Sequence, residues 1–225
     1  MSAYYTRNDR LYVAVDCVIF GLDHGRLCLL LTKRSFEPEA GKWSLMGGFV
    51  GRDESVDFAA ARVLRDLTGL DGVYMHQVGT FGAVDRDPGE RVVSVAYSAL
   101  VNIANVDSSA VEAHNAHWMP LEELPELGFD HPQMIERALG SLRSKFAVEP
   151  VAFRLLPPLF TLSQLQSLYE TVLGEEIDKR NFRKRVAEVS CVVPTDEIDK
   201  TGSRRGARLY RFDQNIYNQK KRFKI

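Results

Sequence analysis

The segment from residue 85 to residue 91 alternates acidic and basic side chains in a pattern that could bind a polar ligand. Its sequence is Asp85-Arg86-Asp87-Pro88-Gly89-Glu90-Arg91. Carboxylates accept hydrogen bonds from hydroxyl groups, and guanidinium groups bind phosphate through two parallel hydrogen bonds. The Pro-Gly pair makes the same segment typical of a solvent-exposed turn, which is the alternative interpretation. The candidate ligand-binding residues of this segment are Asp85, Arg86, Glu90 and Arg91.

Three side chains outside this segment are further candidates for the same ligand. Arg34 follows an apolar run, and Trp43 could stack on a sugar ring, although a tryptophan in the core is equally typical. His131 precedes Pro132, where it could lie at the rim of a cleft. No cysteine, histidine or carboxylate cluster accompanies His131 in the sequence, so we predict neither a metal site nor a cofactor.

A longer motif with fixed spacing runs from residue 48 to residue 70. It resembles the Nudix box, G-x5-E-x7-R-E-U-x-E-E-x-G-U, where U is a bulky aliphatic residue. The matching positions are Gly48, Glu54, Arg62, Leu64, Gly69 and Leu70. The preceding run from Gly41 to Gly48 is similar to the strand that enters this box, with Met46 where proline is usual. The resemblance covers about residues 1–145 and implies a Nudix-like α/β/α sandwich with a mixed sheet.

The acidic part of the Nudix box is changed in this chain. In the family, three carboxylates of R-E-U-x-E-E hold Mg²⁺ against a diphosphate. Their positions here are occupied by Val63, Asp66 and Leu67, which share one helical face at spacings i, i+3 and i+4. Because Mg²⁺ requires hard oxygen ligands, we predict no catalytic residues and no hydrolase activity. Glu54 and Arg62 remain, and an ion pair that pins the loop to its helix explains them equally well.

A basic helix and a basic loop near the C-terminus have the residue types that read DNA. Between 179 and 189, Phe182, Val186 and Val189 form an apolar face, so the basic side chains project outward. A helix can enter the major groove, where Arg reads guanine and Asn reads adenine, while Lys neutralises phosphate. The candidate DNA-binding residues are Lys179, Arg180, Asn181, Arg183, Lys184, Lys200, Ser203, Arg204 and Arg205. Further basic residues of the tail, Lys220, Lys221, Arg222 and Lys224, extend the positive surface. Few aromatic residues interleave with them, which disfavours single-stranded RNA.

Charge divides the 225-residue chain into an acidic and a basic part. Residues 1–149 carry a net charge of −7 and residues 150–225 a net charge of +6, although the whole chain is at −1. The proline-containing segment 147–160 separates the two parts, and we predict domains at 1–148 and 149–225. Three scattered cysteines and the absence of a long apolar run predict a cytoplasmic protein that does not cross a membrane.

The elements that must position these residues follow from periodicity and capping signals. Apolar runs predict strands at 11–20, 27–32, 43–50, 73–81, 92–103 and 113–119, with helices at 57–68 and 133–146. In the basic part, Thr161 and Gln164 form a capping box before a helix that Gly174 ends. Asp178 precedes the basic helix, and strands at 191–194 and 207–212 follow it around a polar loop. This order predicts a winged helix-turn-helix domain and an α+β protein overall.

The combination of a degenerate Nudix domain with this basic domain resembles the Nudix-related transcriptional regulators. The run from Asp85 to Ser94, Phe160-Thr-Leu-Ser-Gln-Leu-Gln-Ser-Leu-Tyr-Glu170 and the run from Asp178 to Val186 are similar to that family. The family includes the NrtR regulators of NAD metabolism, which sense ADP-ribose-type nucleotides, and the arabinose-responsive branch, AraR, to which the chain looks most similar.

This resemblance implies a ligand-responsive repressor of sugar utilisation. It would act as a homodimer on a palindromic, double-stranded DNA operator and would be released when L-arabinose occupies the Nudix cleft. Two alternatives stay open: a regulator of NAD metabolism that binds ADP-ribose, and an active Nudix hydrolase.

Overall fold

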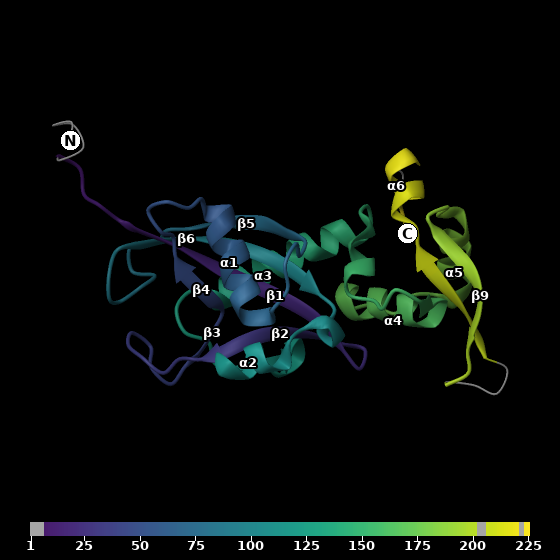
Figure 1. The fold of residues 1–225 in the computed structure, drawn as a ribbon, viewed down its shortest axis with the longest axis horizontal. Coiled ribbons are helices and arrows are strands. Elements are labelled where there is room, and N and C mark those ends of the chain that lie inside the picture. The colour runs from purple at the N-terminus through teal and green to yellow at the C-terminus, as the bar shows by residue number, and fades with distance from the viewer. Residues whose placement is uncertain (1–6, 202–205, 221–222) are drawn as a thin grey trace. The chain divides into compact units, whose positions relative to one another are not determined.

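The computed structural model describes residues 7–201, 206–220 and 223–225. The chain divides into two compact units, which we describe separately. The first contains Met1–Ile19, Leu29–Ala99 and Val106–Ala138, and the second contains Phe20–Cys28, Leu100–Asn105 and Leu139–Ile225. Figure 1 shows their helices and strands. None of the helices in the described part of the chain is long and apolar enough to cross a membrane.

The larger sheet has seven strands, and five of them follow the order β3-β2-β1-β6-β5, while β4 pairs with β1 and β7 with β2. Its strands are β1 (Tyr12–Asp23), β2 (Arg26–Lys33), β3 (Trp43–Ser44), β4 (Met46–Phe49), β5 (Met75–Phe81), β6 (Val92–Val101) and β7 (Ala116–Pro120). Residues 27–31 of β2 are all buried, because this almost wholly apolar run is covered on both faces. The antiparallel register of β1 and β4 places Asp16 opposite Gly47.

Helices pack on this sheet, as the Nudix-like sandwich requires. They are α1 (Val56–Thr68), α2 (Ser108–Ala113) and α3 (His131–Phe146), with a short 3-10 helix at Leu121–Glu123. A further 3-10 helix, Ile103–Asn105, belongs to the second unit. Helix α1 begins where the Ser55 side chain accepts a hydrogen bond from the Phe58 amide, and it ends at Gly69, whose φ of 69° suits glycine. Its buried residues include Ala60, Val63, Leu64 and Leu67, which confirms the predicted inward face. The sequence did not predict α2, which is capped by Asp107 and replaces the start of the strand expected at 113.

From residue 150 onward, the second unit has the element order of a winged helix-turn-helix domain. Its elements are a 3-10 helix (Pro150–Arg154), β8 (Phe160–Thr161), α4 (Leu162–Leu173), α5 (Lys179–Glu188), β9 (Val192–Asp199), β10 (Ala207–Phe212) and α6 (Gln214–Lys220). A three-stranded sheet follows the order β8-β10-β9. The predicted capping box is confirmed, since the Thr161 hydroxyl accepts from the Gln164 amide at 3.1 Å and Gln164 Oε1 accepts from the Thr161 amide at 2.7 Å. Fold class and element order therefore agree with the sequence prediction.

The proline-containing segment packs within this unit, since Val151 and Ala152 are buried and Phe153 stacks on Phe212 with ring centroids 4.5 Å apart. One strand boundary of the unit was predicted wrongly, and one helix was missed. Strand β9 continues to Asp199 rather than ending at Pro194, since pairing with β10 overrides its polar composition. Helix α6 was missed because its start depends on the Asp213 carboxylate, which accepts hydrogen bonds from the amides of residues 215 and 216.

Candidate functional site

A cavity of about 300 Å³ lies in the first unit, where strands β1 and β4 meet the segment around residue 86. The residues of its wall that bear on function are Asp16, Arg34, Phe36, Arg86, Phe129 and His131. A volume of this size is within the range of small-molecule sites, which combine apolar walls with a few fixed polar groups. The cavity is therefore the candidate ligand site of the Nudix unit.

Four charged or polar side chains form a largely buried network at the cavity wall. The Arg86 guanidinium donates two hydrogen bonds to Asp130, from Nε to Oδ2 at 3.0 Å and from Nη2 to Oδ1 at 2.8 Å. Arg86 Nη2 also lies 3.4 Å from Asp16 Oδ2, and the same Asp16 oxygen accepts from the Ser94 hydroxyl at 2.6 Å. The Arg86 side chain is only 4% exposed. Its position is thus fixed by two carboxylates before any ligand binds.

His131 connects this network to the backbone of the strand that enters the Nudix box. Its Nδ1 accepts a hydrogen bond from the Leu45 amide at 3.0 Å, so the ring proton must lie on Nε2. Nε2 faces Asp16 Oδ1 at 3.5 Å. The first residue of α3 therefore fixes both the Asp16 carboxylate and the backbone at the edge of the cavity.

The Asp16 carboxylate stays ionised in this setting. Burial by itself would raise the pKa of Asp16, but hydrogen bonds from His131 and Ser94 and the charge of Arg86 outweigh burial and lower that pKa. Glycine is required opposite this carboxylate, since a Cβ at Gly47 would collide with Asp16 Oδ1 and with the Val15 carbonyl oxygen. Asp16 therefore gives the cavity a fixed negative charge at neutral pH.

Among the described residues, Arg34 is the cation of the cavity wall that forms no ion pair with a carboxylate. Its guanidinium lies 4.5 Å from the ring centre of Phe36 and 4.9 Å from that of Phe129, and its Nε donates to the Pro38 carbonyl at 2.8 Å. Two aromatic faces hold a guanidinium by cation–π attraction without removing its charge. The Nη groups of Arg34 thus remain available to an anionic ligand.

The structure brings only part of the predicted ligand set together. Arg34, Arg86 and His131 line the cavity, whereas Trp43, Asp85, Glu90 and Arg91 do not. Asp85 and Glu90 are exposed. Arg91 donates to the carbonyls of Gly82 and Ala83, and Trp43 packs edge-on against His117 at 5.5 Å. The segment from 85 to 91 is thus organised partly as the turn that its composition allowed.

Sequence reasoning missed Asp16, Ser94, Phe129 and Asp130. A signal existed for Asp16, since it is an ionisable residue inside an otherwise apolar strand. Ser94 and Asp130 offered no such signal, because their role depends on contacts 44 to 78 residues apart in the chain.

The Nudix helix presents aliphatic side chains where the family has carboxylates. Val63 and Leu67 are buried at 6% and 1% exposure in the core, and a Cβ at Gly48 would lie 3.2 Å from Val63. Asp66 is exposed, with its carboxylate 3.7 Å from Arg65. No group of three potential metal ligands occurs among the described residues. These positions therefore do not fit a Mg²⁺ ion held in the family's manner.

Glu54 and Arg62 form an ion pair, the arrangement that the sequence offered as an alternative to catalysis. Arg62 donates to both carboxylate oxygens of Glu54, at 2.7 Å and 3.1 Å, and to the Phe49 carbonyl at 3.3 Å. Glu54 also accepts from the Gly51 amide at 2.7 Å. The hydrogen bond from Arg62 is the main reason that the pKa of Glu54 is lowered. Together these contacts tie the loop before α1 to the helix.

The predicted inward and outward faces of α5 agree with the structure. Phe182, Val186 and Val189 are buried, while Lys179, Arg180, Asn181, Arg183 and Lys184 are exposed. Lys200, at the tip of the hairpin formed by β9 and β10, is exposed as well. The other predicted hairpin residues, Ser203, Arg204 and Arg205, lie outside the described residues. The second unit thus presents a row of cations on one helix.

Two known domain families match this chain. Residues 10–138 match the NUDIX domain, and residues 152–212 match the NrtR DNA-binding winged helix domain. The chain is 37% identical, over 96% of its length and 88% of the relative's, to the ADPR-responsive transcriptional repressor NtrR of Acinetobacter baylyi. The chain therefore belongs to the NrtR family of Nudix-related regulators.

Two solved structures support this assignment. The structure of Shewanella oneidensis NrtR complexed with a 27mer DNA matches with a TM-score of 0.81 and 32% identity, over 92% of this chain and 95% of that chain. The NUDIX domain of the same NrtR complexed with ADP ribose matches with a TM-score of 0.50 and 32% identity, over 63% of this chain and 99% of that chain. The predicted likeness to the arabinose-responsive branch finds no support among these relatives, which fit the NrtR branch better.

Proposed function

We propose that this protein is a transcriptional repressor whose binding to DNA is controlled by ADP-ribose, and that it regulates NAD metabolism. The observation that carries the proposal is the 37% identity to an ADPR-responsive repressor across nearly the whole of both chains. In this proposal, ADP-ribose takes the place of L-arabinose as the effector. The rest of the hypothesis is kept: the regulator acts as a homodimer on a palindromic operator.

Two residues of the cavity wall, Arg34 and Asp16, suit a ligand that has both a diphosphate and ribose hydroxyl groups. Arg34 offers guanidinium N–H donors to the diphosphate, because only its Nε is occupied by a protein acceptor. The Asp16 carboxylate can accept hydrogen bonds from ribose hydroxyls, since it is ionised and lines the same cavity. Arg86 and His131 would hold Asp16 in place rather than bind the diphosphate directly.

Calorimetric titration of the full chain tests this choice of effector. We expect a saturable heat of binding with ADP-ribose and none with L-arabinose or xylose, because neither sugar has an anionic group for Arg34. The Arg34→Met variant should weaken ADP-ribose binding by about tenfold or more, as expected for the loss of a charge-assisted hydrogen bond. Heat from a sugar but not from the nucleotide would reject the proposed effector.

We also infer that the Nudix unit binds ADP-ribose without hydrolysing it. Val63 and Leu67 supply no oxygen ligand, and Asp66 is the sole carboxylate at the three positions. Incubation with ADP-ribose and Mg²⁺, followed by chromatography for AMP and ribose 5-phosphate, should show no turnover above a protein-free control. Mg²⁺-dependent cleavage that Asp66→Ala abolishes would instead establish the hydrolase alternative.

The proposed regulation depends on linkage between effector and DNA. An effector shifts a conformational equilibrium only if it binds one arrangement of the dimer more tightly than the other. Half-sites of a palindromic operator lie about 34 Å apart, so a small rotation between the two subunits is enough to misplace one recognition helix. We propose that residues 1–148 form the sensing domain of each subunit and residues 149–225 its DNA-binding domain.

A further inference from the structure

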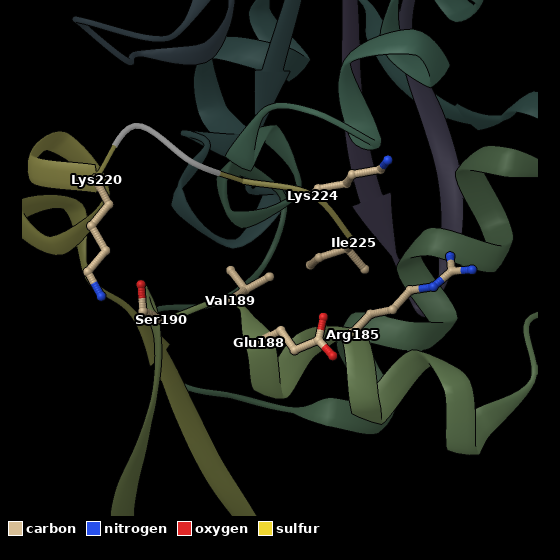
Figure 2. Close-up of a pocket in the computed structure, with 7 residues that line it drawn as sticks. All are labelled: Arg185, Glu188, Val189, Ser190, Lys220, Lys224 and Ile225. Carbon is tan, nitrogen blue, oxygen red and sulfur yellow. The ribbon is translucent and has the colours of Figure 1, made fainter.

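The second unit contains a hollow of about 850 Å³ beside the end of α5 (Figure 2). It is lined by Arg185, Glu188, Val189, Ser190, Lys220, Lys224 and Ile225. Helix α5 provides the first two residues, the turn after it the next two, and α6 with the following segment the last three. The hollow is therefore bounded on one side by the helix whose outward residues are the predicted readers of DNA.

The hollow concentrates positive charge that the protein does not neutralise. Three cationic side chains and one carboxylate side chain line it. Within the described ranges, Arg185, Lys220 and Lys224 make no ion pair, whereas Arg62 and Arg86 of the first unit each pair with a carboxylate. Neighbouring unpaired cations repel one another, and an anion placed between them relieves that repulsion.

The polar side chains of the hollow form two groups, with the apolar side chain of Val189 between them. In Figure 2, Lys220 and Ser190 lie on one side of Val189, and Arg185 and Lys224 lie on the other. Val189 is buried, while the charged side chains and Ser190 are exposed. Two separated groups of donors suit an extended anion with repeated charges better than a single compact one.

We propose that this hollow is a second DNA contact, in which Arg185, Lys220 and Lys224 hold the phosphate backbone beside the groove that α5 enters. The proposal rests on the DNA-binding part of the proposed function. A phosphate backbone supplies successive charges along a line, and lysines on flexible stems follow it as point charges. The Ser190 hydroxyl, directly after α5, adds a neutral donor of the kind that often contacts phosphate oxygens.

Glu188 provides a second test, in which a substitution should strengthen DNA binding instead of weakening it. Its carboxylate lies among the three cations and makes no ion pair with them. A phosphate bound there would be repelled by Glu188, so Glu188→Gln should strengthen DNA binding by a few-fold. Loss of the two lysines and loss of the Glu188 charge should therefore shift DNA affinity in opposite directions.

The experiment measures the binding of the full chain to two duplexes by fluorescence anisotropy at several salt concentrations. One duplex is enriched from random 27-base-pair DNA by the wild-type protein, and the other is a scrambled duplex of the same length. The variants are Lys220→Ala with Lys224→Ala, Glu188→Gln, and Lys33→Ala as a control, because Lys33 is an exposed lysine of the first unit. Thermal melting of each variant checks that the substitution leaves the fold unchanged.

We expect the double lysine variant to bind both duplexes more weakly by the same factor, at least tenfold in dilute salt. The slope of log affinity against log salt should fall by about 1.8, since each lost phosphate contact removes about 0.9. The ratio between the two duplexes should stay unchanged, because phosphate contacts position the protein without reading sequence. Lys33→Ala should match the wild type.

Unchanged affinity and salt slope in the double variant would overturn the inference. So would a loss confined to the enriched duplex, which would indicate base reading instead. If the double variant keeps DNA binding but loses binding of pyrophosphate or polyglutamate, the hollow is a site for another anion and the inference is also wrong. If the wild type binds neither duplex, the DNA-binding part of the proposed function is wrong. This outcome differs from a wild type that binds DNA and a double variant that binds equally well, which would reject only the second contact.

Discussion

Replacing Arg86 with methionine should lower the free energy of unfolding by about 3–5 kcal/mol. Arg86 neutralises two carboxylates, and its side chain is 4% exposed. Without it, Asp16 and Asp130 would face each other as buried charges with no cation between them. Methionine keeps the apolar stem of the side chain, so most of the loss would come from charge and hydrogen bonding. Chemical denaturation monitored by tryptophan fluorescence measures the change.

Two further variants separate this effect from the general cost of removing an arginine. Arg65→Met removes an exposed guanidinium that lies 3.7 Å from Asp66, and it should cost no more than about 1 kcal/mol. Adding Asp130→Asn to Arg86→Met should restore part of the stability, because one uncompensated carboxylate becomes neutral. If Arg86→Met unfolds at the wild-type denaturant concentration, the buried network has no structural role.

Alanine at Arg183 should reduce affinity for the enriched duplex by about 5- to 150-fold, which corresponds to about 1–3 kcal/mol for one lost base contact. Arg183 is exposed on α5, while Phe182 beside it is buried. If Arg183 reads a base, its loss should also lower the ratio of enriched to scrambled binding. Lys184→Ala should instead weaken both duplexes equally, as a phosphate contact would.

The matched control for these variants is Arg52→Ala, an exposed arginine in the loop before α1. ADP-ribose binding should be unchanged in all three variants, because none of the three residues lines the cavity. Normal binding of the enriched duplex by Arg183→Ala and Lys184→Ala would show that α5 is not the recognition helix.

The sequence predicted an element correctly where the ends and faces of that element depend on residues close together in the chain. The capping box at Thr161, the stop at Gly69 and the apolar faces of α1 and α5 all depend on spacings of a few residues, and the structure confirms them. The end of β9 could not be found in this way, because its polar second half is a strand only through pairing with β10. Helix α2 was also missed, since it is only 6 residues long and lies mostly between two predicted strands.

The ligand cavity was only partly predictable from sequence. Arg86 stood out because of its unusual segment, but the sequence suggested a clamp for phosphate, whereas Asp130 and Asp16 hold its side chain. The available cation is Arg34, whose environment depends on Phe36 nearby and on Phe129 far along the chain. The residues of the cavity did not identify the effector, and the predicted likeness to the arabinose-responsive branch finds no support among the relatives.

The most direct test is effector-dependent release of DNA by the full chain. Anisotropy of the labelled enriched duplex, held near half-saturation, is followed while ADP-ribose or L-arabinose is added. We expect ADP-ribose to lower DNA affinity in a saturable way that Arg34→Met shifts to higher concentration, and L-arabinose to have no effect. Release by L-arabinose, or no response to ADP-ribose although the duplex is bound, would contradict an ADP-ribose-controlled repressor.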